Sequence, residues 1–143
     1  MAKKSKNSSE TMKGGVPMLR VHLWLEREGS MFFGLGRVQL LELVDRLGSL
    51  NRAAKAVGMS YRAAWGRIKA SEERLGAPLL AEASGRRGYE LTPLARTLMA
   101  DFMAWHREVE AFALQRAQEV FPWPVRPFQE PEGGAQDQPE EPK

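Results

Sequence analysis

The residues whose types and spacing could do chemistry are basic, and their densest group lies in one short segment. Residues 51–76 carry six Lys or Arg side chains against Glu72 and Glu73, a local charge of +4. The net charges of the two ends of the chain cancel, because residues 1–17 carry +3 and residues 122–143 carry −3. Because Lys and Arg neutralise phosphates and Arg also hydrogen-bonds base edges, this clustering predicts contact with a nucleic acid.

No comparable set of residues predicts an enzyme or a metal site. Cysteine is absent, which excludes thiolate catalysis and cysteine-ligated zinc. His22 and His106 lie far apart in the sequence, without the spacing of metal ligands. The sequence also holds no Gly-rich phosphate loop and no nucleophile with a matching base. We therefore expect no catalysis, no cofactor and no bound metal.

The elements that would position the basic residues follow from the apolar spacing. Apolar residues recur at helical intervals over 38–47, which predicts a first helix that Gly48 ends. Ser49 can cap a short, Ala-rich second helix, and Ser60 can cap a third helix that continues to about Leu75. Two helices joined by a short Gly-containing turn form a helix-turn-helix, whose second helix enters the DNA major groove.

Short strands and a long helix are expected around this unit. Alternating apolar residues over 19–34 predict an N-terminal β-hairpin with its turn near Gly29. Residues 78–91 predict two short strands around the basic turn SGRRG, which would be a wing. Residues 92–120 begin with Thr-Pro and predict one long helix. The predicted fold is therefore α+β, mainly α with small β elements: a winged helix-turn-helix with a long C-terminal dimerisation helix.

Residues at the start of the third helix are the candidates for reading bases, because a reading helix enters the groove N-terminus first. The assigned base-contact residues are Ser60, Tyr61, Arg62 and Arg67. The residues assigned to phosphate contacts or to the wing are Asn51, Arg52, Lys69, Arg86 and Arg87. The alternative for Arg62 and Arg67 is that they are solvated or pair with Glu72 and Glu73. Trp65 either packs beneath the second helix, which is favoured, or lies against the sugar-phosphate chain.

The long helix carries an apolar stripe at heptad-like spacing. Its residues, which we assign to a dimer interface, are Leu98, Phe102, Trp105, Val109 and Phe112. A two-fold dimer would present two reading helices about 34 Å apart to a roughly palindromic site. The alternative is that the stripe covers the domain's own first helix and hairpin.

Composition divides the chain into one domain and two tails. Residues 1–17 are expected to be a disordered basic tail, residues 18–121 the domain, and residues 122–143 a Pro-rich acidic tail. No apolar run is long enough for a membrane span or for a signal peptide, so we expect a cytoplasmic protein without membrane contact.

The segment GRVQLLELVDRLGSLNRAAKAVGMSYRAAWGRIKASEERLGAPLL, with YELTPLARTLM after the wing, resembles the N-terminal DNA-binding domain of the bacterial, molybdate-responsive ModE-type regulators. The most specific element is SY-x-x-AW at the start of the reading helix, and LTPLA shows a wider similarity to LysR-type winged domains. The resemblance covers about Leu19 to Leu98. It implies a winged helix-turn-helix transcription regulator that binds double-stranded DNA.

The resemblance has two departures. The ModE-type wing resembles GG-x-x-GGGA-x-LT, whereas this chain has SGRRGYELT. Full-length members also carry a C-terminal oxyanion-binding portion of small β-barrel modules, and only a short segment follows the long helix here. Molybdate sensing is therefore not expected. The alternative function is a protein adaptor that uses the aromatic long helix as its binding surface.

Overall fold

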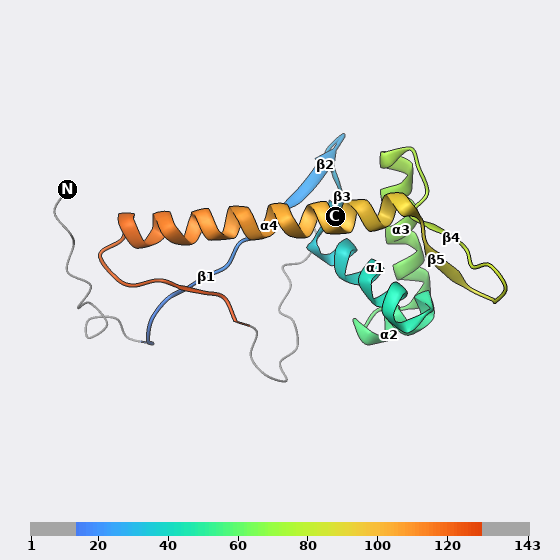
Figure 1. Cartoon of the computed structure of the whole chain (residues 1–143), viewed down its shortest axis with the longest axis horizontal. Coiled ribbons are helices and arrows are strands. Elements are labelled where there is room, and N and C mark those ends of the chain that lie inside the picture. Colours follow the sequence, from blue (N-terminus) through green and yellow to red (C-terminus); the bar gives the residue numbers. More distant parts are fainter. Residues whose placement is uncertain (1–13, 130–143) are drawn as a thin grey trace. The chain divides into compact units, whose positions relative to one another are not determined.

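The computed structural model describes residues 14–129, and its elements follow the predicted order (Figure 1). In chain order they are β1 (Met18–Leu19), β2 (Trp24–Arg27), β3 (Ser30–Gly34), α1 (Leu35–Leu47), α2 (Leu50–Ala56), α3 (Tyr61–Leu75), β4 (Leu80–Glu82), β5 (Tyr89–Leu91), α4 (Pro93–Val120) and β6 (Arg126–Pro127). The α+β winged-helix fold class is confirmed, mainly helical with small strand pairs. Within residues 14–129, no helix is both long enough and apolar enough to cross a membrane.

Two compact units share the described residues. Residues 23–104 form the larger unit, and residues 14–22 with residues 105–129 form the smaller one. Helix α4 contributes its first part to the larger unit and its remainder to the smaller. The expected tail segments 1–13 and 130–143 lie outside the described residues.

The helix-turn-helix forms at the predicted boundaries because its caps are satisfied locally. Gly48 ends α1 in the left-handed conformation with φ of 78°, which a residue with a Cβ rarely adopts. The Ser49 hydroxyl oxygen accepts a hydrogen bond from the Arg52 N–H at 3.0 Å and caps α2. The Ser60 oxygen accepts in the same way from the Ala63 N–H at 3.0 Å and caps α3.

Helices α1, α2 and α3 pack around one apolar core in the larger unit. The most buried apolar side chains in these helices are Val38, Leu40, Leu41, Val44, Leu50, Ala53, Ala54, Ala64 and Ile68. The alanines leave no exposed surface, so α2 and α3 approach each other closely, as the helix-turn-helix requires. Phe33 of β3 meets Phe102 of α4 edge to face, with ring centroids 5.7 Å apart, and this pair connects the hairpin to α4.

The N-terminal hairpin is shorter than predicted. Strands β2 and β3 are antiparallel, and Glu28 and Gly29 form their turn with φ of 54° and 77°. Leu19, at which the predicted hairpin begins, belongs instead to β1 and pairs with Pro127 of β6. The alternation continues through Leu19, but its hydrogen-bonding partner lies at the other end of the described chain. Sequence periodicity predicts a strand without naming its partner, which explains the difference.

In the smaller unit, a short segment folds back along the end of α4. Residues 122–129, which the sequence analysis assigns to the acidic tail, include β6, whose two residues pair in parallel with β1. Val125 is 7% exposed, and its carbonyl oxygen accepts a hydrogen bond from the Gln118 side chain at 2.9 Å. The Arg20 guanidinium lies 4.1 Å from the ring centre of Phe128. These contacts order residues that a composition argument alone places in a tail.

Candidate nucleic-acid interface

The N-terminal end of α3 presents side chains to solvent on one side and fills the core with the other. Ala64 and Ile68 are fully buried, whereas Tyr61 is 46% exposed and Arg62 is also exposed. Arg62 makes no hydrogen bond or ion pair with another residue of the described range 14–129. Its guanidinium is therefore available to an external acceptor, and the alternative in which Arg62 pairs with Glu72 or Glu73 does not form.

The other two candidates for base contact on α3 are placed differently. Ser60 uses its oxygen as the helix cap, which leaves its hydroxyl hydrogen as the donor for an external group. Arg67 is half-buried and already engaged within the chain. Of the predicted base-contact residues, Tyr61 and Arg62 are therefore the most accessible.

Trp65 supports the helix from the side of the wing. Its ring packs on Tyr89 of β5, with centroids 5.0 Å apart, and it borders the core. Trp65 therefore packs against its own domain, but its aromatic partner lies in β5, whereas the favoured sequence interpretation placed the ring beneath the second helix. Lys69 follows one turn later, with its ammonium nitrogen 4.5 Å from the Trp65 ring centre and 3.0 Å from Glu72 Oε1.

Glu72 connects the C-terminal part of α3 to the start of β4. Its Oε2 accepts hydrogen bonds from the backbone N–H groups of Leu79 at 2.7 Å and Leu80 at 3.3 Å. Burial by itself would raise the pKa of this carboxyl group, but the Lys69 hydrogen bond and the two amides outweigh burial and hold the pKa below 4.5. The ionised carboxylate therefore fixes β4 against α3.

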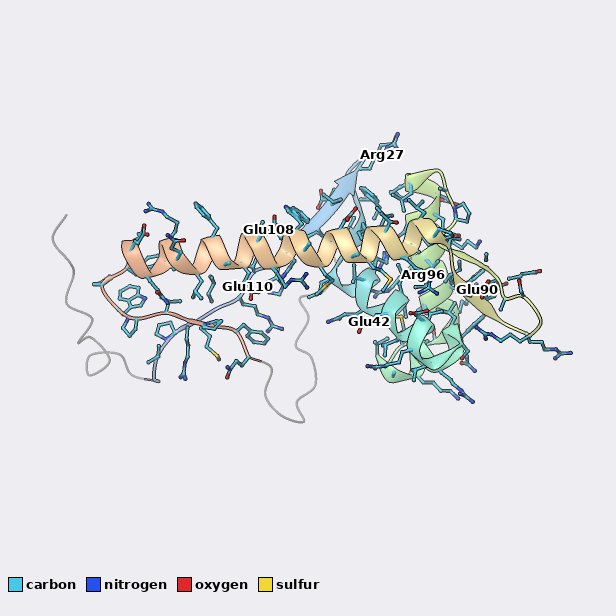
Figure 2. All side chains as sticks on the ribbon, viewed as in Figure 1. Arg27, Glu42, Glu90, Arg96, Glu108 and Glu110 are labelled. Atoms are coloured by element: carbon cyan, nitrogen blue, oxygen red, sulfur yellow. The ribbon has the colours of Figure 1, made fainter. Side chains whose placement is uncertain are left out.

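Further polar contacts hold neighbouring elements of the larger unit. The Arg37 Nε donates to Ser71 Oγ at 2.9 Å, and that hydroxyl donates to the carbonyl of Phe32, so α1, α3 and β3 meet at one buried site. Arg27, at the tip of the hairpin in Figure 2, donates to the carbonyl of Arg74 at 2.8 Å. These bonds restrain α3 along its C-terminal half.

Helix α4 is attached to α1 by an ion pair. Arg96, labelled in Figure 2, places its Nη2 2.9 Å from Asp45 Oδ1. Asp45 is the main reason that the pKa of Arg96 lies above its ordinary value, and Glu90 adds to the effect. This exposed ion pair links the first turn of α4 to α1.

The start of α2 and the wing supply the remaining basic side chains. Asn51 and Arg52 are exposed in the first turn of α2, as expected for residues that contact phosphates. In the loop between β4 and β5, Arg87 is exposed. Arg86 is also exposed, but it has a partner within the protein, because its Nη1 donates to the carbonyl oxygen of Gly48 at 2.8 Å. Sequence reasoning missed this contact, which joins residues 38 positions apart.

The apolar stripe of α4 divides into a buried and an exposed part. Leu98 packs against the core and Phe102 is 4% exposed, so assigning Phe102 to a dimer interface is wrong: its own domain already covers it. Trp105 is 37% exposed, Val109 is half-buried, and Phe112 is 66% exposed. The first part of the stripe follows the predicted alternative, in which the helix covers its own domain.

Comparison with known proteins gives the family of this region. Residues 35–96 match the family described as bacterial regulatory helix-turn-helix protein, lysR family. Residues 35–96 are a LysR-type helix-turn-helix domain. All nine residues predicted to contact DNA fall inside this LysR-type domain, and the five stripe residues of α4 follow it.

Two relatives match this chain over 83 and 86 residues. The chain is 41% identical over 83 residues to the molybdenum-pterin-binding protein MopB of Rhodobacter capsulatus, covering 56% of this chain and 30% of MopB. It is 40% identical over 86 residues to the molybdenum transport protein ModE of Azotobacter vinelandii, covering 58% and 32%. The chain thus spans about a third of the length of these relatives. The resemblance to ModE-type proteins is confirmed for the matched stretch.

Among solved structures, the crystal structure of a CbnR_DBD–DNA complex is similar to the LysR-type region. It has 24% sequence identity and a TM-score of 0.47, covering 59% of this chain and 94% of that chain. A LysR family transcriptional regulator from Eggerthella lenta has 27% identity and a TM-score of 0.40, covering 49% and 96%.

Proposed function

We propose that this protein is a bacterial transcription regulator that binds double-stranded DNA through its LysR-type domain. The observation that carries the proposal is the N-terminal end of α3, where Tyr61 and Arg62 are exposed and Arg62 is unpaired within residues 14–129. An arginine at the start of a reading helix can donate two hydrogen bonds to guanine in the major groove. A regulator that binds bacterial DNA would act in the cytoplasm.

Base readout and backbone contact are assigned to different residues. Tyr61 and Arg62, with Ser60 and Arg67 beside them, contact base edges. The side chains that contact phosphates are Asn51, Arg52, Lys69 and Arg87. Arg86 lies next to Arg87 in the wing. Phosphate contacts fix the position of the domain on the duplex, and base contacts supply specificity. The matched relatives' names concern molybdenum, but the match covers about a third of each, so molybdenum binding is not carried over to this chain.

The protein acts as a homodimer through the exposed part of α4. Trp105, Val109 and Phe112 recur at intervals of four and three residues, the spacing of a helix–helix seam. Phe112 is 66% exposed, and a side chain of this size is stabilised by burial against a second copy. Two-fold pairing would present two copies of α3 to an inverted repeat. The protein-adaptor alternative is not favoured, because the similarity is to DNA-binding regulators.

The test is a titration of fragmented bacterial DNA, with binding followed as salt concentration rises. Three charged phosphate contacts per protomer, from Arg52, Lys69 and Arg87, give about six in a dimer and a slope of log affinity against log salt of about −5. Arg62→Ala should weaken binding by about 1–3 kcal/mol, as expected for a lost base contact.

The matched control is Arg107→Ala, which removes an equally exposed arginine of α4 that lies outside the LysR-type domain. This variant should bind as the unmodified protein does. Equal losses in both variants would show that only overall charge matters. No binding at low salt would overturn the proposed function.

A further inference from the structure

Two adjacent arginines of the wing make different contacts. Arg86 Nη1 donates to the carbonyl oxygen of Gly48 at 2.8 Å, whereas Arg87 makes no hydrogen bond or ion pair with another residue of the described range. Both side chains are exposed and both carry a positive charge. Their neighbouring positions in SGRRG therefore do not make them equivalent, because one guanidinium has a partner in the protein and the other has none.

The carbonyl that Arg86 binds belongs to the turn between α1 and α2. Gly48 ends α1, and the next residue, Ser49, caps α2, so this turn sets where the helix-turn-helix begins. The last carbonyl groups of a helix lack partners within the helix, so they accept hydrogen bonds from cationic side chains readily. Arg86 supplies such a bond from a distant loop, and a charged donor makes it stronger than a neutral one.

The wing comes close to this turn on the side of Gly88. Gly88 has φ of 106°, and a Cβ at this position would lie 3.8 Å from the Gly48 oxygen and 3.9 Å from Arg86 Nη1. The wing loop is closed at its base by the Ala83 N–H, which donates to the Gly88 carbonyl at 2.9 Å. The loop therefore has two attachments: one within itself and one, through Arg86, to the α1–α2 turn.

We propose that Arg86 is a positioning residue that holds the wing against the α1–α2 turn, and that Arg87 is the wing residue that contacts the DNA backbone. This inference rests on the proposed DNA binding. The Arg86 bond restrains the loop before DNA arrives, so that Arg87 meets a phosphate from a fixed position. Without the Arg86 bond the loop keeps only its attachment within itself, and Arg87 loses most of its contribution although its charge is unchanged.

A double-mutant comparison separates this role from direct contact by both arginines. Arg87→Ala should remove one phosphate contact per protomer, two in a dimer, and make the salt slope shallower by about 1.8, equivalent to about 12-fold in affinity between 50 and 200 mM salt. Arg86→Ala should weaken binding through the loss of the same contact. In the Arg87→Ala background, Arg86→Ala should then change neither slope nor affinity. If the salt slope of the double variant is shallower than that of Arg87→Ala by a further ~1.8, the proposal is overturned.

Hydrogen exchange of the free protein tests the same contact without DNA. Arg86→Ala should speed exchange of the Ala83 amide, whose bond to Gly88 closes the loop, and Arg87→Ala should leave it unchanged. Equal exchange rates in Arg86→Ala and the unmodified protein would overturn the positioning role. A protein that binds no DNA at low salt would refute the proposed function, and the exchange result would still decide whether Arg86 holds the wing.

Discussion

Replacing Glu72 with Gln removes the charge that joins α3 to the wing and keeps the size of the side chain. The carboxylate accepts from two backbone amides, at 2.7 and 3.3 Å, and pairs with Lys69 at 3.0 Å. A hydrogen bond to a charged group contributes about 1.5–3 kcal/mol to stability. The amide oxygen of Gln can still accept from one backbone N–H, but its NH2 group would face the Lys69 ammonium. We therefore expect Glu72→Gln to lower the free energy of unfolding by about 1–3 kcal/mol at pH 7.

The pH dependence of this loss follows from the lowered pKa of Glu72. The folded pKa lies below 4.5, the ordinary value for the unfolded chain, so the ionised carboxylate stabilises the fold fully above pH 4.5. This contribution is lost as the pH falls through the folded pKa. The difference in stability between the unmodified protein and Glu72→Gln should therefore be largest near neutrality and should shrink below pH 4.5.

The assay is urea unfolding followed by tryptophan fluorescence, repeated from pH 7 to pH 3. Glu73→Gln is the matched control, since Glu73 is the exposed neighbour on the same helix. Its effect should stay within about 0.5 kcal/mol. Equal stability of the two variants at pH 7, or a difference that persists unchanged at pH 3, would refute the role of the Glu72 charge.

Two further predictions concern α4 and the glycines. Phe112→Asp should shift the protein from dimer to monomer in light scattering, because it places a charge on the exposed part of the stripe. The control Ala111→Asp lies off the stripe and should leave the dimer intact. If the unmodified protein is already a monomer, the proposed dimer interface on α4 is contradicted. Gly34→Ala should destabilise the fold by about 1–3 kcal/mol, because its Cβ would lie 3.0 Å from the Trp24 Cβ. At Gly66, inside a helix, an added Cβ would meet nothing within 4 Å, so Gly66→Ala should raise the free energy of unfolding in urea by about 0.5–1 kcal/mol. A Gly34→Ala protein more stable than Gly66→Ala would contradict this account of the packing.

Local chemistry made the helix-turn-helix predictable from the sequence. Gly48, Ser49 and Ser60 act within a few residues of themselves, so their types predict where α1 ends and where α2 and α3 begin. The base-contact candidates follow from these caps, because a helix start fixes which side chains come first. The short wing was also predictable, since a basic turn between two apolar runs indicates two strands.

Contacts between distant residues were not predictable in the same way. The bond from Arg86 to Gly48 and the pairing of β1 with β6 depend on chain folding that no local pattern reports. Phe102 could not be assigned correctly for the same reason, because heptad spacing predicts an apolar helix face but not which element packs against that face. Phe33 covers Phe102 in the structure, and the stripe therefore serves the domain's own core before it can serve a partner.

The claim that α3 reads DNA sequence is tested most directly by selecting bound fragments from a random DNA library. The unmodified protein should enrich an inverted repeat, and Arg62→Ala should lose its preference at one base pair of each half-site while keeping the rest. Arg107→Ala should enrich the same sequence as the unmodified protein. Enrichment of no sequence at all, or an unchanged preference at every position in Arg62→Ala, would contradict the account.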